Sequence, residues 1–269
     1  MADAPIIDAL YGIPKNTAVT QLSECLPFMQ DLRGPMRAVG ISGVVLVQRH
    51  CGYCPYHWSC ADRRTREVSV LARQNSAVRG LASYDSLRIG ESLRWIHEAI
   101  AGGGLSGCYL QAECLVSGLD TARMYPLYGL CAMLRAPLVL DFSSRENWLR
   151  HLPEIETMAA DFPELEIVLT PPQDTEAPNI LRLALRFPRI SFILCPEEMD
   201  ANAALREFVE LQGRERVLFC SSLNGWPESV QVARKLEVMP AAAEAYLYGN
   251  AARLFSFPAV VDAASERLA

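Results

Sequence analysis

Residues 48–60 bring together side chains that bind metals or act as nucleophiles. Three cysteines and two histidines lie within eleven positions: His50, Cys51, Cys54, His57 and Cys60. The Cys-x2-Cys spacing of Cys51 and Cys54 suits one tetrahedral metal ion, and Cys60 or an imidazole can complete its ligands. Because thiolates favour soft and borderline metals, zinc is the expected cofactor. The alternative is a cofactor-free loop in which the thiols only pack beneath aromatic side chains.

This loop follows an apolar run, Gly43–Gln48, whose composition predicts a buried strand. The loop therefore leaves the carboxyl end of a strand. In parallel α/β folds, ligands bind at that end. We expect the loop to form one wall of a site.

Three carboxylates occupy similar positions after other predicted strands. Asp85, Glu113 and Asp141 each lie at or just past a strand end. Carboxylates in an open pocket are natural general acids or bases, so these three are the candidate catalytic residues. The alternative is a solvated rim, with ion pairs to Arg49 or Arg79.

Two further thiols and one more carboxylate also lie at predicted strand ends. Cys195 and Cys220 end the last two strands, so they are expected to face the same end of the sheet. They either join the loop cysteines in a thiol-rich pocket or simply fill space. Asp8, near the end of the first strand, is expected to be a structural hydrogen-bond acceptor.

The elements that must position these residues alternate along the whole chain. The predicted strands are Pro5–Leu10, Gly43–Gln48, Val78–Tyr84, Gly107–Gln111, Pro137–Asp141, Glu166–Thr170, Ser191–Cys195 and Arg216–Cys220. The predicted helices are Asp62–Gln74, Gly90–Ala101, Asp120–Leu134, Arg145–Ala160, Ala177–Arg186, Asp200–Gln212 and Pro227–Leu236, followed by Ala241–Leu254 and Pro258–Leu268.

Strict alternation of strand and helix implies a parallel sheet. Eight such units in 269 residues fit a single-domain (β/α)8 TIM barrel over residues 1–269, because this fold takes about 250 residues. The last two helical segments are expected to cover the barrel. A doubly wound sheet is the alternative, but no glycine-rich fingerprint follows the first strand.

Composition excludes several classes of protein. The net charge is −6 and the sequence has no long basic run, so we expect no nucleic-acid partner. No apolar run approaches the length of a membrane span, and the first residues lack the features of a signal peptide. An odd count of nine cysteines, with Cys108 and Cys131 in apolar patterns, is typical of a reduced, cytoplasmic protein.

Several phrases, in chain order, resemble amidohydrolase-related, metal-dependent hydrolases. They are Ile6-Ile7-Asp8-Ala9, Tyr125-Pro126-Leu127-Tyr128, the runs 136–140 and 162–169, Gly213-Arg214-Glu215-Arg216-Val217-Leu218-Phe219 and Tyr248-Gly249-Asn250-Ala251-Ala252-Arg253-Leu254-Phe255. The resemblance spans nearly the whole chain. It implies a (β/α)8 barrel that hydrolyses or decarboxylates small molecules with one or two divalent metals.

The same resemblance places other residues at the family's metal-ligand positions. Its first-strand His-x-His pair corresponds to Leu10 and Gly12, and its fifth-strand histidine to Asp141. The remaining positions are Gln111 or Glu113 on strand four, Pro171 or Thr170 on strand six, and Ser222 on strand eight. A metal-bound water reaches a useful pKa only when several protein ligands hold the metal. We therefore expect the family's activity to be absent.

Two classes of function follow. In the first, the chain is a non-catalytic amidohydrolase-like barrel, acting as a subunit or as a small-molecule or metal binder. In the second, it is a metal-dependent hydrolase or lyase with a rebuilt Cys/His/Asp site at the barrel mouth. The missing histidines favour the first class, and the reactive side chains at the strand ends favour the second. The expected partners are a small-molecule ligand and a second copy or an enzyme subunit.

Overall fold

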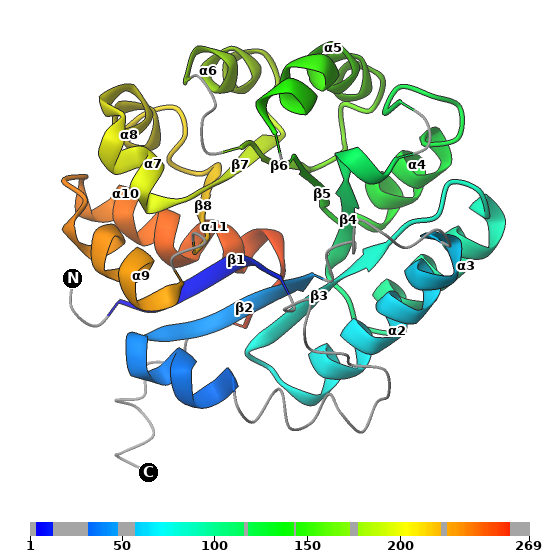
Figure 1. The fold of residues 1–269 in the computed structure, drawn as a ribbon, viewed down its shortest axis with the longest axis horizontal. Helices are drawn as coiled ribbons and strands as arrows, with labels where there is room; N and C mark the ends of the chain where they lie inside the picture. The colour runs from blue at the N-terminus through cyan, green and yellow to red at the C-terminus, as the bar shows by residue number, and fades with distance from the viewer. Residues whose placement is uncertain are drawn as a thin grey trace.

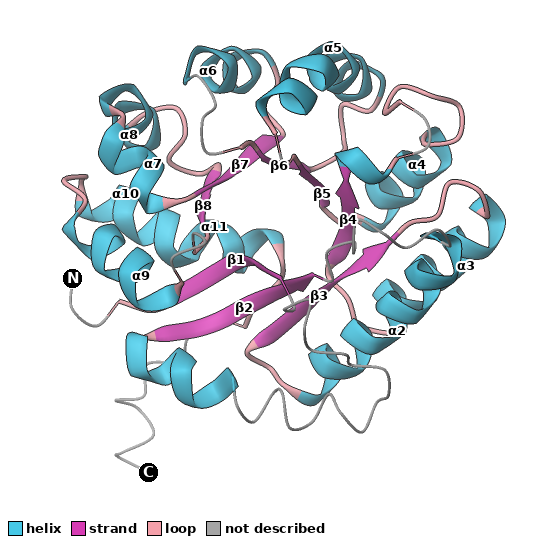
Figure 2. Cartoon of the chain, in the orientation of Figure 1, coloured by secondary structure: helices cyan, strands magenta, loops and turns pink. Residues whose placement is uncertain are grey.

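The computed structural model describes residues 4–12, 32–47, 57–115, 118–142, 144–172, 177–221 and 225–258. Eight strands form one sheet in the order β1 to β8, and each successive pair from β1·β2 to β7·β8 is parallel. The strands curve into a nearly closed barrel inside a ring of helices (Figure 1, Figure 2). The predicted (β/α)8 TIM barrel is confirmed.

The strands are β1 (Ile6–Gly12), β2 (Ile41–Val47), β3 (Val78–Ser83), β4 (Gly107–Gln111), β5 (Leu138–Asp141), β6 (Ile167–Thr170), β7 (Ile190–Leu194) and β8 (Val217–Phe219). Each overlaps the strand that the sequence predicts. Their strong signal comes from runs of β-branched and aliphatic side chains that are buried on both faces, as parallel strands require.

The helices are α2 (His57–Gln74), α3 (Ile89–Ala101), α4 (Tyr125–Leu134), α5 (Arg145–Asp161), α6 (Ala177–Arg186), α7 (Pro196–Ala201), α8 (Ala203–Glu210), α9 (Trp226–Lys235), α10 (Pro240–Glu244) and α11 (Asn250–Leu254). Residues 32–39 are also helical. A short 3₁₀ turn, η1 (Ala112–Cys114), follows β4, and a π-helical turn, η2 (Ala245–Gly249), joins α10 to α11. None of the helices described is long and apolar enough to cross a membrane.

Three predicted helices differ from the observed ones at their ends. The helix predicted at Asp62 already begins at His57. The helix predicted at Asp120 begins at Tyr125, so that Pro126 lies in its first turn, where the missing N–H costs nothing. The prediction of one helix over Asp200–Gln212 is wrong, because the Asn202 side chain accepts from the amides of Ala204 and Leu205 and starts a new helix.

The core has two layers, one between strands and helices and one inside the barrel. The interior cluster consists of Ile7, Ala9, Leu10, Val45, Val47, Leu81, Tyr109, Val139, Val168, Ile193, Cys195, Leu218 and Cys220 from the strands and the residues that directly follow them, with Ala251 and Leu254 from α11 and Phe255 just after it. Alternate residues point inward, as expected for side chains that fill a barrel, except at the adjacent Ala9 and Leu10 of β1, where the register with β2 shifts.

The last helix closes the amino end of the barrel, which confirms the predicted C-terminal cover. Asn250 donates to the carbonyl of Val217 at the start of β8. Gly43, near the start of β2, leaves room for Phe257, since a Cβ there would lie 2.8 Å from the ring. The carboxyl ends of the strands are therefore the side left for a site. The further helix predicted at Pro258–Leu268 lies, beyond Pro258, outside the described residues.

Candidate functional site at the carboxyl end of the barrel

A buried tyrosine–aspartate pair lies inside the barrel, at the carboxyl ends of β4 and β5. The Tyr109 hydroxyl donates to Asp141 Oδ2 over 2.6 Å. Tyr109 is 3% exposed and Asp141 7%. Asp141 follows Val139 by two residues, so strand alternation points both into the interior. This places the predicted residue Asp141 in the barrel interior and adds Tyr109, which the sequence analysis did not select.

Thr170 extends this polar group to the next strand. It pairs in register with Asp141, and its side chain follows the inward-facing Val168 by two residues. Its hydroxyl oxygen is buried and has no hydrogen-bond partner among the described residues. A buried hydroxyl without a partner costs free energy, so this group is poised to bond a ligand or a water molecule.

The other two predicted carboxylates follow the neighbouring strands. Glu113, in η1 after β4, accepts from the Asn147 side-chain amide over 3.3 Å. Asp85, after β3, accepts from the amide of Leu87 over 2.9 Å, as in the turn that begins a helix. Its second oxygen, Oδ2, is buried with no described partner. Asp85, Glu113 and Asp141 thus follow three adjacent strands, each with a different hydrogen-bond partner.

The suggested ion pair between these carboxylates and Arg79 is wrong. Arg79 lies near the start of β3, at the opposite end of the barrel. Its guanidinium donates to the backbone carbonyl of Ser256, over 2.9 Å from Nη2, and so helps to hold the C-terminal cover.

Asp8 joins the first strand to the last, as its predicted role of structural acceptor suggests. Its carboxylate accepts from the Ser221 hydroxyl over 2.6 Å, from the Trp226 indole over 2.7 Å and from the amides of Ser221 and Leu10. We call this group the Asp8 clasp. Asp8 is fully buried, and burial raises its pKa against the opposing effect of these donors. The clasp closes the seam between β1 and β8.

Cys195 and Cys220 form a thiol pair just past the ends of β7 and β8. Their sulfur atoms lie 3.3 Å apart, and they are 8% and 5% exposed. The hydrogen bond between Cys220 and Cys195, burial and the charges of the Asp8 and Glu198 carboxylates raise the pKa of Cys220 well above its ordinary value. The predicted placement at the same end of the barrel is confirmed, and this thiol is neutral at physiological pH.

Glu198 is a titratable group that the sequence analysis did not select. Its carboxylate accepts from the amide of Cys195 over 2.8 Å, at the start of α7. Glu198 thereby forms part of a capping box at the start of α7. The usual sequence signature of a capping box has Ser or Thr at the first position, where this chain has Cys195. Burial raises the pKa of Glu198 to about 7, with a further increase from the neighbouring Glu197.

Replacing Glu198 with glutamine is expected to stabilise the protein at about pH 8 and to have little effect near pH 4.5. Because the folded-state pKa is raised from 4.5 to about 7, the contribution of Glu198 to stability is complete below pH 4.5 and is lost as pH rises through about 7. Glutamine mimics the protonated form at every pH. After discounting for partial exposure, the gain at about pH 8 is on the order of 2 kcal/mol.

Urea unfolding over this pH range measures the effect, with the exposed Glu207→Gln on α8 as the control. Parallel pH profiles for the Glu198 variant and the wild type would contradict the assignment.

The structure describes the two elements that flank the predicted metal-binding loop, β2 and α2. His50, Cys51 and Cys54 lie outside the described residues. His57 and Cys60 lie in the first turn of α2, where the structure describes the backbone alone. β2 ends at Val47, so residues 48–56 join the carboxyl end of a barrel strand to a helix, as predicted. The metal site itself stays a prediction.

The structure describes side chains at some of the positions to which the resemblance maps the family's metal ligands. Leu10, at a position of the family's histidine pair, packs in the interior cluster, and Gly12 has no side chain. Asp141 is bound to Tyr109. In the part of the chain that the structure describes, no three His, Cys, Asp or Glu side chains are grouped so that they could hold a metal ion.

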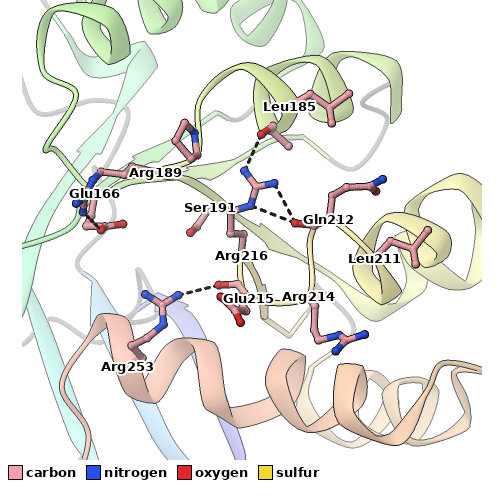
Figure 3. Close-up of a pocket in the computed structure, with 12 residues that line it drawn as sticks. Glu166, Leu185, Arg189, Ser191, Leu211, Gln212, Arg214, Glu215, Arg216 and Arg253 are labelled. Atoms are coloured by element: carbon pink, nitrogen blue, oxygen red, sulfur yellow. Dashed lines mark hydrogen bonds and ion pairs between the residues drawn. The ribbon is translucent and has the colours of Figure 1, made fainter.

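A hollow of about 850 Å³ lies at the opposite end of the barrel (Figure 3). Two of its arginines donate to backbone carbonyls: Arg216 to Ala184 over 2.6 Å and to Gln212 over 2.9 Å, and Arg253 to Glu215 over 2.7 Å. These contacts tie the loops before β8 to α6 and α11. In barrels of this kind the amino end serves stability, so the carboxyl end is the better candidate site.

Comparisons with known proteins agree with the fold and the resemblance. Three similar solved structures are an uncharacterized TIM-barrel protein from Bordetella bronchiseptica (20% identity, TM-score 0.71, covering 94% of this chain and 98% of that one), 5-carboxyvanillate decarboxylase from Sphingomonas paucimobilis (15%, 0.72, 95% and 100%) and the manganese complex of 5-carboxyvanillate decarboxylase from Novosphingobium aromaticivorans (13%, 0.70, 94% and 96%). At these identities they support the fold alone. No curated protein matches.

The match to a family model is more informative, because it covers most of the sequence. The amidohydrolase model aligns with residues 24–257, from before β2 to the end of the C-terminal cover. With eight parallel strands in barrel order and the candidate site at their carboxyl ends, the chain belongs to the amidohydrolase family.

Proposed function

We propose that this amidohydrolase-family barrel binds a small organic molecule at the carboxyl end of its strands, without metal-dependent hydrolysis. The Tyr109–Asp141 pair carries the proposal, because it places a buried hydroxyl and carboxylate inside the barrel where ligands of this fold bind. The apolar Leu10 and Gly12, which has no side chain, support the proposed absence of metal-dependent hydrolysis, since neither residue can bind a metal through its side chain.

The chemistry of the site favours a ligand that donates hydrogen bonds or carries positive charge. Carboxylates follow three adjacent strands at Asp85, Glu113 and Asp141, and their negative charge favours a cation at this end of the barrel. The buried Oδ2 of Asp85 is a further acceptor, and the Thr170 hydroxyl can either donate or accept. Apolar surface from the interior cluster suits a ring. We therefore infer an amine- or hydroxyl-bearing aromatic compound.

Two probes with the same ring and opposite charge test this inference. Vanillylamine is expected to raise the melting temperature, whereas vanillate and 5-carboxyvanillate, the substrate named for two structural neighbours, are not. At about ten times its Kd, a ligand stabilises the folded state by about 1.4 kcal/mol. Tyr109→Phe and Asp141→Asn should each abolish the shift.

The chain offers a matched control on its outer surface. Tyr125 donates to Asp161 between α4 and α5, in an exposed pair of the same chemistry. Tyr125→Phe and Asp161→Asn should leave the vanillylamine shift intact. Binding of the acids instead of the amine would contradict the proposed role of Tyr109 and Asp141 in recognising the ligand. Equal shifts of the melting temperature in both sets of variants would contradict it as well.

A second candidate is a rebuilt metal site in the loop of Cys51 and Cys54. The observation that favours it is the position of this loop, since its ends are anchored by β2 and α2 at the carboxyl end of the barrel. Cys60 or His57 would complete the ligands. Such a site would use thiolates, so it would lose metal on acidification.

We predict that protein purified without chelator contains zinc, with a marked loss in Cys51→Ser and Cys54→Ser. Elemental analysis of the three proteins measures this content. Cys131→Ser is a suitable control, because Cys131 is fully buried beside β4. Near-zero metal in the wild type would mean that the loop cysteines only pack against neighbouring side chains. It would support the first proposal, in which the barrel binds a small organic molecule without a metal.

A further inference from the structure

We propose that Cys195 and Cys220 are an oxidative modification site that a hydroperoxide converts to an intramolecular disulfide. The proposal is independent of the ligand site and rests on the geometry of two neighbouring strands. The sulfur atoms lie 3.3 Å apart inside the barrel, at the ends of β7 and β8. At this distance no other side chain separates the two sulfur atoms.

The strand register brings the two backbones to a suitable separation. Leu194 pairs with Phe219 in the parallel β7·β8 ladder, and each cysteine is the next residue of its strand. Neighbouring strands lie about 4.8 Å apart, and disulfides span Cα separations of about 4.4–6.8 Å. Two inward-facing side chains at the same level of adjacent strands therefore satisfy the requirement without a change in topology.

The surroundings favour a disulfide over a metal site as the use of these thiols. The nearby carboxylates of Asp8 and Glu198 act on Cys220 through their charge. Within the described residues, however, no three such groups come together as metal ligands. Joining the two thiols in a disulfide removes two electrons from the pair, so an oxidant is required. Hydrogen peroxide is a two-electron oxidant that can supply this change.

The reaction proceeds in two balanced steps. Hydrogen peroxide oxidises one thiol to a sulfenic acid and is itself reduced to water. The sulfur of the second cysteine then attacks the sulfenic sulfur, the S–O bond breaks, and the hydroxyl leaves as a second water with the thiol proton. The product is two hydrogen atoms lighter than the reduced protein, and a dithiol reductant reverses the change.

The structure provides an internal control for exposure. Cys108 and Cys131 also form a hydrogen-bonded thiol pair, but both are fully buried between β4 and α4. Cys195 and Cys220 retain 8% and 5% exposure at the open end of the barrel. The folded protein should therefore oxidise at the second pair and leave the first reduced.

Peptide mapping of folded, full-length protein treated with hydrogen peroxide tests the proposal. Free thiols are alkylated before digestion, and trypsin separates the two cysteines into peptides 190–206 and 217–234. Most molecules should yield these peptides linked, and dithiothreitol should release them. Peptides 95–123 and 124–135, which contain Cys108 and Cys131, should remain alkylated at those cysteines.

Two variants and one control variant sharpen the result. Cys195→Ser and Cys220→Ser should each abolish the linked peptide, whereas Cys108→Ser should not; circular dichroism confirms that each variant is folded. Recovery of both cysteines as alkylated thiols or as sulfinic acids would overturn the proposal. So would linkage of either cysteine to a different one, or linkage that appears only after denaturation.

Discussion

Replacing Asp8 with alanine is expected to lower the free energy of unfolding by about 3 kcal/mol. Four donors lose their acceptor at once: the Ser221 hydroxyl and amide, the Trp226 indole and the Leu10 amide. Each buried donor without a partner costs about 1–3 kcal/mol, and relief from burying a carboxylate offsets part of the sum. Urea denaturation monitored by circular dichroism measures the change.

Two further substitutions separate the clasp from a general effect of losing charge. Asp8→Asn keeps one acceptor oxygen, so its loss of stability should fall between those of the wild type and the alanine variant. Asp200→Ala removes an exposed carboxylate on α7 and should change stability by no more than about 0.5 kcal/mol. If Asp8→Ala unfolds at the same urea concentration as the wild type, the clasp does not hold the seam.

Metal-dependent hydrolysis of simple lactones, esters and amides is expected to stay at the uncatalysed rate when zinc or manganese is supplied. The resemblance maps the family's ligand positions on β1 to Leu10 and Gly12, and Asp141 accepts a hydrogen bond from Tyr109. Loss of a positioned general base alone costs about 10²–10⁴ in rate, and loss of the activating metal adds to this. Initial rates with each ion and each substrate class, against protein-free controls, test the expectation.

The control for this experiment is the Asp141→Ala variant. Contaminating enzyme would give the same rate in both preparations after successive purification steps, whereas a genuine site would lose activity with Asp141. Metal-dependent turnover that follows the protein through purification would falsify the proposal that this barrel only binds its ligand, and its loss in Asp141→Ala would identify the catalytic carboxylate.

The fold could be predicted because each strand carries its own signal. Runs such as 138–140 and 192–194 are apolar on both faces, which occurs in parallel strands covered on both sides. Helix ends were less predictable, since they depend on individual hydrogen bonds. Asn202 interrupts a continuous helical pattern only because its side chain caps the next segment, and periodicity does not record such a contact.

The candidate site was predictable in its positions but not in its pairings. Asp141, Cys195 and Cys220 could be placed at strand ends from the sequence alone. The Tyr109 hydroxyl could have been added by strand alternation, since it lies two residues before the last residue of β4. The partners of Asp8 could not, because Trp226 is separated from it by 218 positions and only the closed barrel brings them together.

The C-terminal cover has a consequence for how this chain reaches its native state during synthesis. Ala251, Leu254 and Phe255 fill the amino end of a barrel whose first strand begins at Ile6. The ribosome adds about 5–20 residues per second, so the barrel interior stays incomplete for roughly ten seconds or more while the rest of the chain is made. Until then the inward faces of β1 and β2 lack their apolar partners from the last helix. Cooperative closure of the barrel is therefore an event that follows the synthesis of residues 250–255.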